Sequence, residues 1–149
     1  MKSLESPEVL SEVRGRLRNL RADDGALWGK MSVGQMVRHL SCSFEVALGE
    51  RTVGPVKGLP PAVIKWLALR SGLRWTKNIQ TTPELKLAMS ENSEVGFDVL
   101  VGEAIDKMEI LATGKQCAPS HPFFGPMTEA DWLRWGYLHA DHHLRQFGR

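Results

Sequence analysis

The stretch "GYLHADHHLRQFG", residues 136–148, lies near the end of a 149-residue chain and holds three of its five histidines. An α-helix turns by about 100° per residue, so His139 and His143 lie about 40° apart on one face, one turn along the axis. Large apolar residues recur on the same side, namely Trp132, Leu133, Trp135, Leu144 and Phe147. The spacing predicts a helix that carries both histidines on its buried face, with His142 toward the edge of that face.

The start of this helix has a capping signature, because Thr128 is followed by Asp131 at the third helical position. Two other segments begin in a similar way. Ser6 is followed by a proline and an acid, and an apolar stripe runs from Leu10 to Leu20. Ser32 and a glutamine three residues later form a capping box for a helix that extends to about residue 49.

A third long helix is expected from Ser93–Glu94 to Gly114, because apolar residues keep helical spacing there. Residues 50–92 are predicted to be loops with one short helix over Ala62–Arg70, and "TKNIQTTPE" is assigned to a loop. No segment shows convincing strand alternation. Four amphipathic helices joined by one long connection predict an all-α four-helix bundle that occupies residues 1–149 as a single domain.

The composition is that of an ordinary globular protein, with 42% hydrophobic and 24% charged residues. A formal net charge of +2 is too small to indicate nucleic acid as the main partner. Two cysteines, Cys42 and Cys117, do not form a disulfide framework, which favours a reducing compartment. Neither an apolar signal segment at the beginning nor a bilayer-length apolar run is visible, so we expect a cytoplasmic protein without a membrane partner.

A basic tract with no acidic residue inside it lies in the long connection, and comprises Arg51, Lys57, Lys65, Arg70, Arg74 and Lys77. A run of this kind is usually a solvated face. The alternative is that it attracts an anionic ligand.

Two imidazoles at positions i and i+4 can bind one divalent ion, as on the HExxH helix of zinc proteases. No glutamate stands between His139 and His143, so the protein is not a protease of that type. A catalytic metal needs about three protein ligands, and the third must come from elsewhere in the chain. The residues leave two candidates open, His39 on the second helix and His121 before the last helix. The alternative is that the pair consists of buried, hydrogen-bonded histidines without a metal.

Two blocks of the sequence, "LWGKMSVGQMVRHL" at residues 27–40 and "HPFFGPMTEADWLRWGYLHADHHLRQFG" at residues 121–148, resemble the DinB/YfiT-like superfamily of metal-binding four-helix bundles. The closest similarity is to a branch of mostly unknown function, with the pattern H-P-x-F-G followed by H-x-D-H-H-x-R-Q-F-G. The intervening 80 or so residues match only in helical character.

The resemblance implies a three-histidine metal site formed by His39, His139 and His143. It implies zinc or nickel as the usual ion, although imidazole ligands alone do not separate these from iron or manganese. Related families include thiol transferases that use a low-molecular-weight thiol and a thiol-dependent maleylpyruvate isomerase. The resemblance therefore favours a metal-dependent enzyme, with the thiol-dependent transfer of these related families as the first hypothesis and hydrolysis as the second.

The alternative hypothesis is a non-catalytic metal-binding or structural protein. Structural zinc usually has four protein ligands, so a fourth ligand would favour this alternative and an open position would favour chemistry. Acid–base candidates for an enzyme are Glu45, Asp24 and His121, and the sequence does not choose among them. The expected partner is a small-molecule substrate, and a homodimer is an option that the sequence leaves open.

Overall fold

The computed structural model describes residues 1–58, 60–90 and 94–149. Its helices and strands follow the chain in this order: α1 (Pro7–Arg18), α2 (Val33–Ala47), α3 (Pro61–Leu69), α4 (Pro83–Ser90), α5 (Phe97–Ala112), β1 (Ser120–His121), β2 (Gly125–Pro126) and α6 (Glu129–Gln146). The protein is therefore mostly helical, as predicted.

Local side-chain hydrogen bonds define the helix starts that the sequence indicated. Ser32 and Gln35 form a reciprocal capping box at α2, and Thr128 and Asp131 form another at α6. Ser6 accepts a hydrogen bond from the Val9 N–H at the start of α1. These hydrogen bonds satisfy backbone N–H groups that have no partner within the first helical turn.

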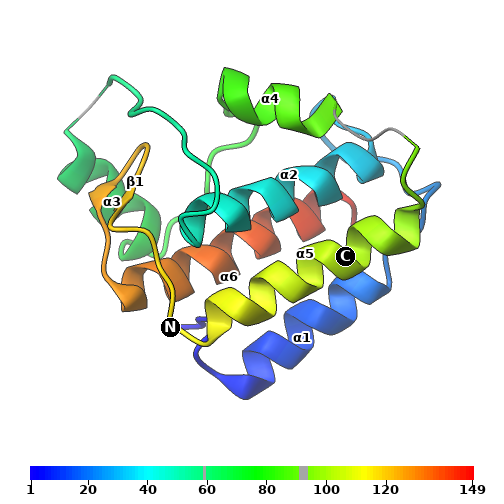
Figure 1. Ribbon diagram of the computed structural model, residues 1–149, viewed down its shortest axis with the longest axis horizontal. Coiled ribbons are helices and arrows are strands. Elements are labelled where there is room, and N and C mark those ends of the chain that lie inside the picture. Colours follow the sequence, from blue (N-terminus) through cyan, green and yellow to red (C-terminus); the bar gives the residue numbers. More distant parts are fainter. Residues whose placement is uncertain (59, 91–93) are drawn as a thin grey trace.

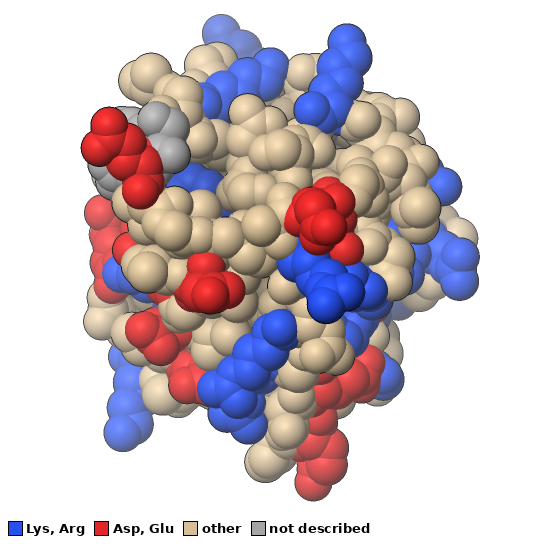
Figure 2. Space-filling view, turned by 90° about the vertical axis from the view of Figure 1, so that its right-hand side faces the viewer, with Lys and Arg blue, Asp and Glu red and all other residues tan. Residues whose placement is uncertain are grey.

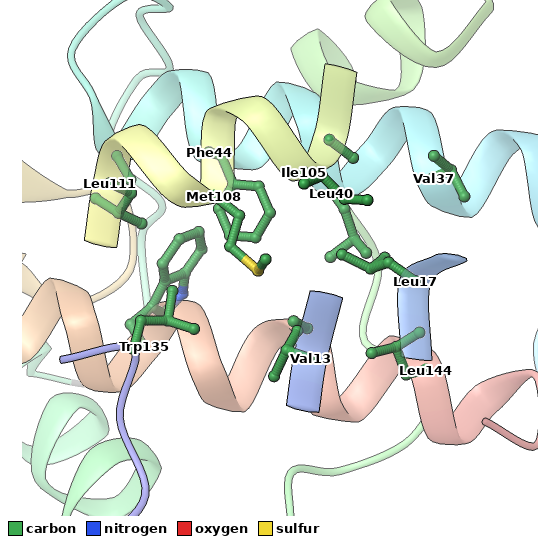
Figure 3. Close-up of a cluster of buried hydrophobic side chains, with 14 of the residues drawn as sticks. Val13, Leu17, Val37, Leu40, Phe44, Ile105, Met108, Leu111, Trp135 and Leu144 are labelled. Carbon is green, nitrogen blue, oxygen red and sulfur yellow. The ribbon is translucent and has the colours of Figure 1, made fainter. Parts of the chain in front are cut away.

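The four longer helices α1, α2, α5 and α6 lie side by side in Figure 1. Helices α1 and α2 each pack against both α5 and α6. Figure 3 shows side chains from all four of these helices directed into the space between them, among them Val13 of α1, Phe44 of α2, Met108 of α5 and Leu144 of α6. These four residues are completely buried, so the space between the helices is the main hydrophobic core.

In its described part, the connection between α2 and α5 contains two helices, whereas the sequence pattern predicts one. Helix α4 begins at Pro83, so the prediction of a loop over "TKNIQTTPE" was wrong at its last two residues. Leu85 and Ala88 of α4 pack with Cys42 and Val46 of α2 in a second apolar cluster. Figure 1 shows α4 lying over α2. A short amphipathic helix of this kind is stabilised mainly by such tertiary packing.

The start of the third long helix also differs from the prediction. Helix α5 begins at Phe97 with Gly96 as its N-cap, and Glu94 precedes it in a turn. Ser93 lies outside the described residues. Residues 120–126, predicted as loop, contain two strands of two residues each, which pair antiparallel and bring His121 opposite Gly125.

The molecular surface in Figure 2 carries Lys and Arg side chains beside Asp and Glu side chains, which agrees with the small net charge. In the part of the chain that the structure describes, no helix is long and apolar enough to cross a membrane.

Candidate metal centre

Three histidines from two helices meet at one place. His39 of α2 and His139 and His143 of α6 each offer a ring nitrogen, and these three atoms lie within 4.8 Å of one another. The Nε2 atoms of His39 and His139 are 3.1 Å apart, and the His39 ring centroid is 4.8 Å from that of His143. Two nitrogens that bind one zinc ion at about 2.0–2.1 Å must lie within about 4.2 Å of each other, a condition that the Nε2 pair meets.

Burial keeps these imidazoles neutral. Removal from water, with a smaller contribution from His142, lowers the pKa of His39 to about 4. Burial and the neighbouring His39 lower the pKa of His143 to about 3. Burial lowers the pKa of His139 well below its usual range, and the adjacent histidines lower it further. A neutral imidazole is the form that binds a metal ion, so the three side chains have the right protonation state for ligands at neutral pH.

A hydrogen-bonded chain fixes the orientation of His143. The Gln146 Nε2–H donates to the Trp28 carbonyl at 2.9 Å, so the Oε1 atom of the same amide faces His143. The His143 Nδ1 lies 2.8 Å from this oxygen and must donate to it. The proton of the neutral ring therefore sits on Nδ1, and Nε2 keeps the lone pair that a metal requires.

The absence of a side chain at Gly29 leaves room for the hydrogen bonds that link His143, Gln146 and Trp28. Gly29 has a φ of +82°, and a Cβ placed on it would lie 2.6 Å from the Gln146 Nε2. A side chain at this position would be strained by the left-handed backbone and would displace the amide that orients His143. Glycine is therefore required here by conformation and by space.

Two buried polar atoms near the three histidines have no hydrogen-bond partner among the described residues, His39 Nδ1 and Ser43 Oγ. Both residues are on α2, four positions apart, and both line the same cavity. Buried polar atoms without partners are rare in native proteins and commonly contact an ion, a ligand or ordered water. Together with three neutral imidazole donors, these atoms fit a site that holds a metal ion and its ligands.

A cavity of about 880 Å³ opens above the histidines. Its aromatic wall surrounds them, since the Trp135 and His139 ring centroids are 4.8 Å apart and the Trp75 and His139 centroids are 5.8 Å apart. His142 lies at the edge of the cavity between Trp28 and Trp75, with centroid distances of 6.0 and 6.1 Å. His142 is not one of the three clustered histidines, in line with its predicted edge position.

His121, the other candidate for the third ligand, also lines the cavity but is not part of the cluster. Its ring stacks on Phe124 at a centroid distance of 4.3 Å, and burial lowers its pKa to about 3. Its Nδ1 accepts a hydrogen bond from the Phe123 N–H at 3.1 Å, so the ring proton is on Nε2. That Nε2–H group has no protein partner within the described part of the chain.

The other acid–base candidates do not line this cavity. Glu45 pairs with Arg51 at 2.9 Å, and Asp24 pairs with Arg149. Of the three residues that the sequence left open for this role, only His121 therefore faces the cavity.

Sequence reasoning missed the roles of Gln146, Trp28 and Gly29, which act together through contacts between distant segments. It also missed α4, for which a local signal exists. Thr82 precedes Pro83 and Glu84, and the Thr82 hydroxyl accepts a hydrogen bond from the Leu85 N–H at 3.5 Å. The same order of cap, proline and acid identified α1.

The chain matches the family described as "Protein of unknown function (DUF1569)" over residues 2–149. It belongs to this family. No curated protein and no solved structure matches the chain significantly. The DUF1569 match covers all three clustered histidines together with Gln146 and Gly29.

Proposed function

We propose that this DUF1569 protein is a metal-dependent enzyme of the DinB/YfiT-like kind, a four-helix bundle in which His39, His139 and His143 hold one divalent ion. Zinc and nickel both suit imidazole ligands, and we propose one of these two. The observation that carries the proposal is the convergence of three neutral imidazoles at the wall of a large cavity.

A catalytic role is favoured over a structural one by the number of ligands. In residues 1–58, 60–90 and 94–149, no cysteine, aspartate or glutamate joins the three histidines. Structural zinc is typically closed by four protein ligands, whereas catalytic zinc has three and an open position. A site with three ligands beside a cavity can receive a small molecule at the fourth position.

We propose that the protein transfers a low-molecular-weight thiol to an electrophilic substrate, by forming a bond between the thiol sulfur and the substrate. Hydrolysis is the second candidate. A bound divalent ion supplies positive charge, which lowers the pKa of a coordinated thiol or water. The protein residues perform the remaining tasks. Gln146 holds the His143 ring in the ligating tautomer, Trp75 and Trp135 cover the histidines with apolar surface, and the His121 Nε2–H donates to an acceptor atom of the bound substrate.

Metal analysis of two matched variants tests the ligand set. His139→Ala removes one of the three converging imidazoles and is expected to lose most of the bound metal. His142→Ala removes a histidine three residues away that lies outside the cluster, and it should keep a metal content near that of the wild type. Equal loss in both variants, or retention in both, would contradict the assignment.

The proposed reaction is tested by a screen of the metal-loaded protein with several low-molecular-weight thiols and a generic electrophile. Thiol consumption should exceed that of the metal-free protein and of His139→Ala. If the metal-loaded protein consumes neither thiol nor a panel of hydrolysable esters faster than the metal-free protein, the catalytic proposal fails even where the metal site stands.

A further inference from the structure

The charged residues that line the cavity are all positive. Among the described residues that line it there are three cations, Lys30, Arg74 and Lys86, and no aspartate or glutamate. The three cations come from separate segments, because Lys30 precedes α2, Arg74 follows α3 and Lys86 belongs to α4. A cavity with cations at its wall and no acid carries a positive potential that favours an anionic ligand.

The structure divides the basic tract into residues that are already paired and residues that are not. Lys65 and Arg70 both contact the buried Asp131, at 3.3 and 2.8 Å. Lys77 lies over the Trp28 ring, 4.4 Å from its centroid. Arg51 pairs with Glu45. These contacts occupy most of the tract, so the tract as a whole is not an anion-binding site.

Arg74 is different, because it lines the cavity and has no carboxylate partner within the described part of the chain. Lys30 and Lys86 share both properties, but Lys86 already donates a hydrogen bond to the Gln80 amide oxygen. Arg74 immediately precedes Trp75, whose ring faces His139. Arg74 and Trp75 therefore follow one another in the chain, and both line the cavity that contains the three histidines.

Large apolar side chains make up much of the remaining cavity wall, and some of them reach the surface. Leu67, Leu73 and Ile79 line the cavity and remain 40, 66 and 66% exposed. Large apolar side chains gathered at the mouth of a cavity mark a place where an apolar group binds, because binding removes their surface from water. These side chains line a concave wall, which fits a small molecule better than a flat partner surface.

We propose that the cavity binds a small organic anion with an apolar body, and that Arg74 and Lys30 hold its carboxylate at the mouth. The apolar body lies between Trp75 and the three exposed aliphatic side chains, and its far end points toward the histidines. This inference rests on the proposed function for the identity of the site, and it adds the class of substrate. The ligand is thus held by its charge at one end and reacts at the other.

Calorimetric titration with three matched probes tests the charge requirement. Octanoate, octanamide and octylammonium have the same chain and differ in the charge of the head group. Octanoate should bind at least tenfold more tightly than octylammonium, with octanamide in between. Octanamide binding as tightly as octanoate would overturn the role of the cations, and absence of octanoate binding would overturn the proposal as a whole.

Variants locate the anion within the cavity. Arg74→Gln should weaken octanoate binding about fivefold, as expected for a partly exposed ion pair, and Lys30→Gln should weaken it by a similar factor. Lys57→Gln removes an exposed tract cation that does not line the cavity, so it should leave octanoate binding unchanged. Equal weakening in Arg74→Gln and Lys57→Gln would show only a nonspecific effect of net charge and would refute the assignment.

The metal dependence separates this inference from the proposed function. The metal-free wild-type protein should bind octanoate as the metal-loaded protein does, because the carboxylate is held at the mouth and not by the ion. Loss of octanoate binding on removal of the metal would place the carboxylate at the histidines and overturn the inference. Normal octanoate binding by a wild-type protein that takes up no zinc or nickel would instead refute the proposed function and leave the anion site standing.

Discussion

Replacing Gln146 tests whether the orientation of His143 matters for metal binding. Gln146 is 3% exposed, and its amide links the His143 ring to the Trp28 carbonyl by bonds of 2.8 and 2.9 Å. Gln146→Leu keeps a similar volume but removes both bonds. The His143 ring then loses the acceptor that keeps its proton on Nδ1. The proton can move to Nε2, which in that tautomer has no lone pair for a metal.

The expected magnitude follows from these contacts. Loss of a partner that orients a metal-bound histidine typically lowers metal affinity by about 10- to 100-fold, or about 1.4–2.7 kcal/mol. The unpaired Nδ1–H also costs about 1–3 kcal/mol of folding stability, because His143 is buried. Gln146→Glu keeps an acceptor for His143 and loses the donor to Trp28, so its zinc affinity should fall less than that of Gln146→Leu.

Zinc competition against a chromogenic chelator measures the affinity, and circular dichroism confirms that each variant is folded. Gln116→Leu is a suitable control, since Gln116 donates to the Leu48 carbonyl away from the cavity. An affinity of Gln146→Leu within twofold of the wild type, when His139→Ala has lost its metal, would refute the reasoning.

Three further predictions concern stability. Deletion of residues 144–149 removes the buried side chains of Leu144 and Phe147, at about 1.5–3 kcal/mol each, and calorimetry should show a melting temperature lower by roughly 6–20 °C; an unchanged value would mean that the last turn of α6 is frayed. The metal-free protein should lose stability as the pH falls below about 6.5, because the histidines of the unfolded chain then bind protons while the buried histidines of the folded protein stay neutral. In urea titrations the free energy of unfolding should fall by about 1.4 kcal/mol per pH unit for each such histidine, and His121→Phe should make this dependence less steep. Asp131→Asn should lower the free energy of unfolding by about 1.5–3 kcal/mol, since Asp131 caps α6 and pairs with Lys65 and Arg70 of the α3 region; a change below 0.5 kcal/mol in urea unfolding would show that these pairs are energetically neutral.

The sequence by itself determined the four longer helices and the histidine pair, because the signals that set them are local. Ser32 and Thr128 mark helix starts through contacts with residues three positions on, and the buried residues of α6 follow from helical periodicity. His139 and His143 share a face for the same reason. Helix α4 also has a local signal in the order of Thr82, Pro83 and Glu84, so its start can be predicted from the sequence.

Only the tertiary structure decided which groups meet. The residues alone left His39 and His121 open as partners of the pair, and the packing of α2 against α6 brings His39 to within 3.1 Å of His139. The contact of Gln146 with Trp28 joins positions 118 residues apart, a separation that no periodicity can signal. The same packing pairs Lys65 with Asp131 and leaves Arg74 at the cavity wall. Helix formation depends on neighbours in the sequence, whereas the site and its charge depend on which distant side chains the fold places within a few ångströms.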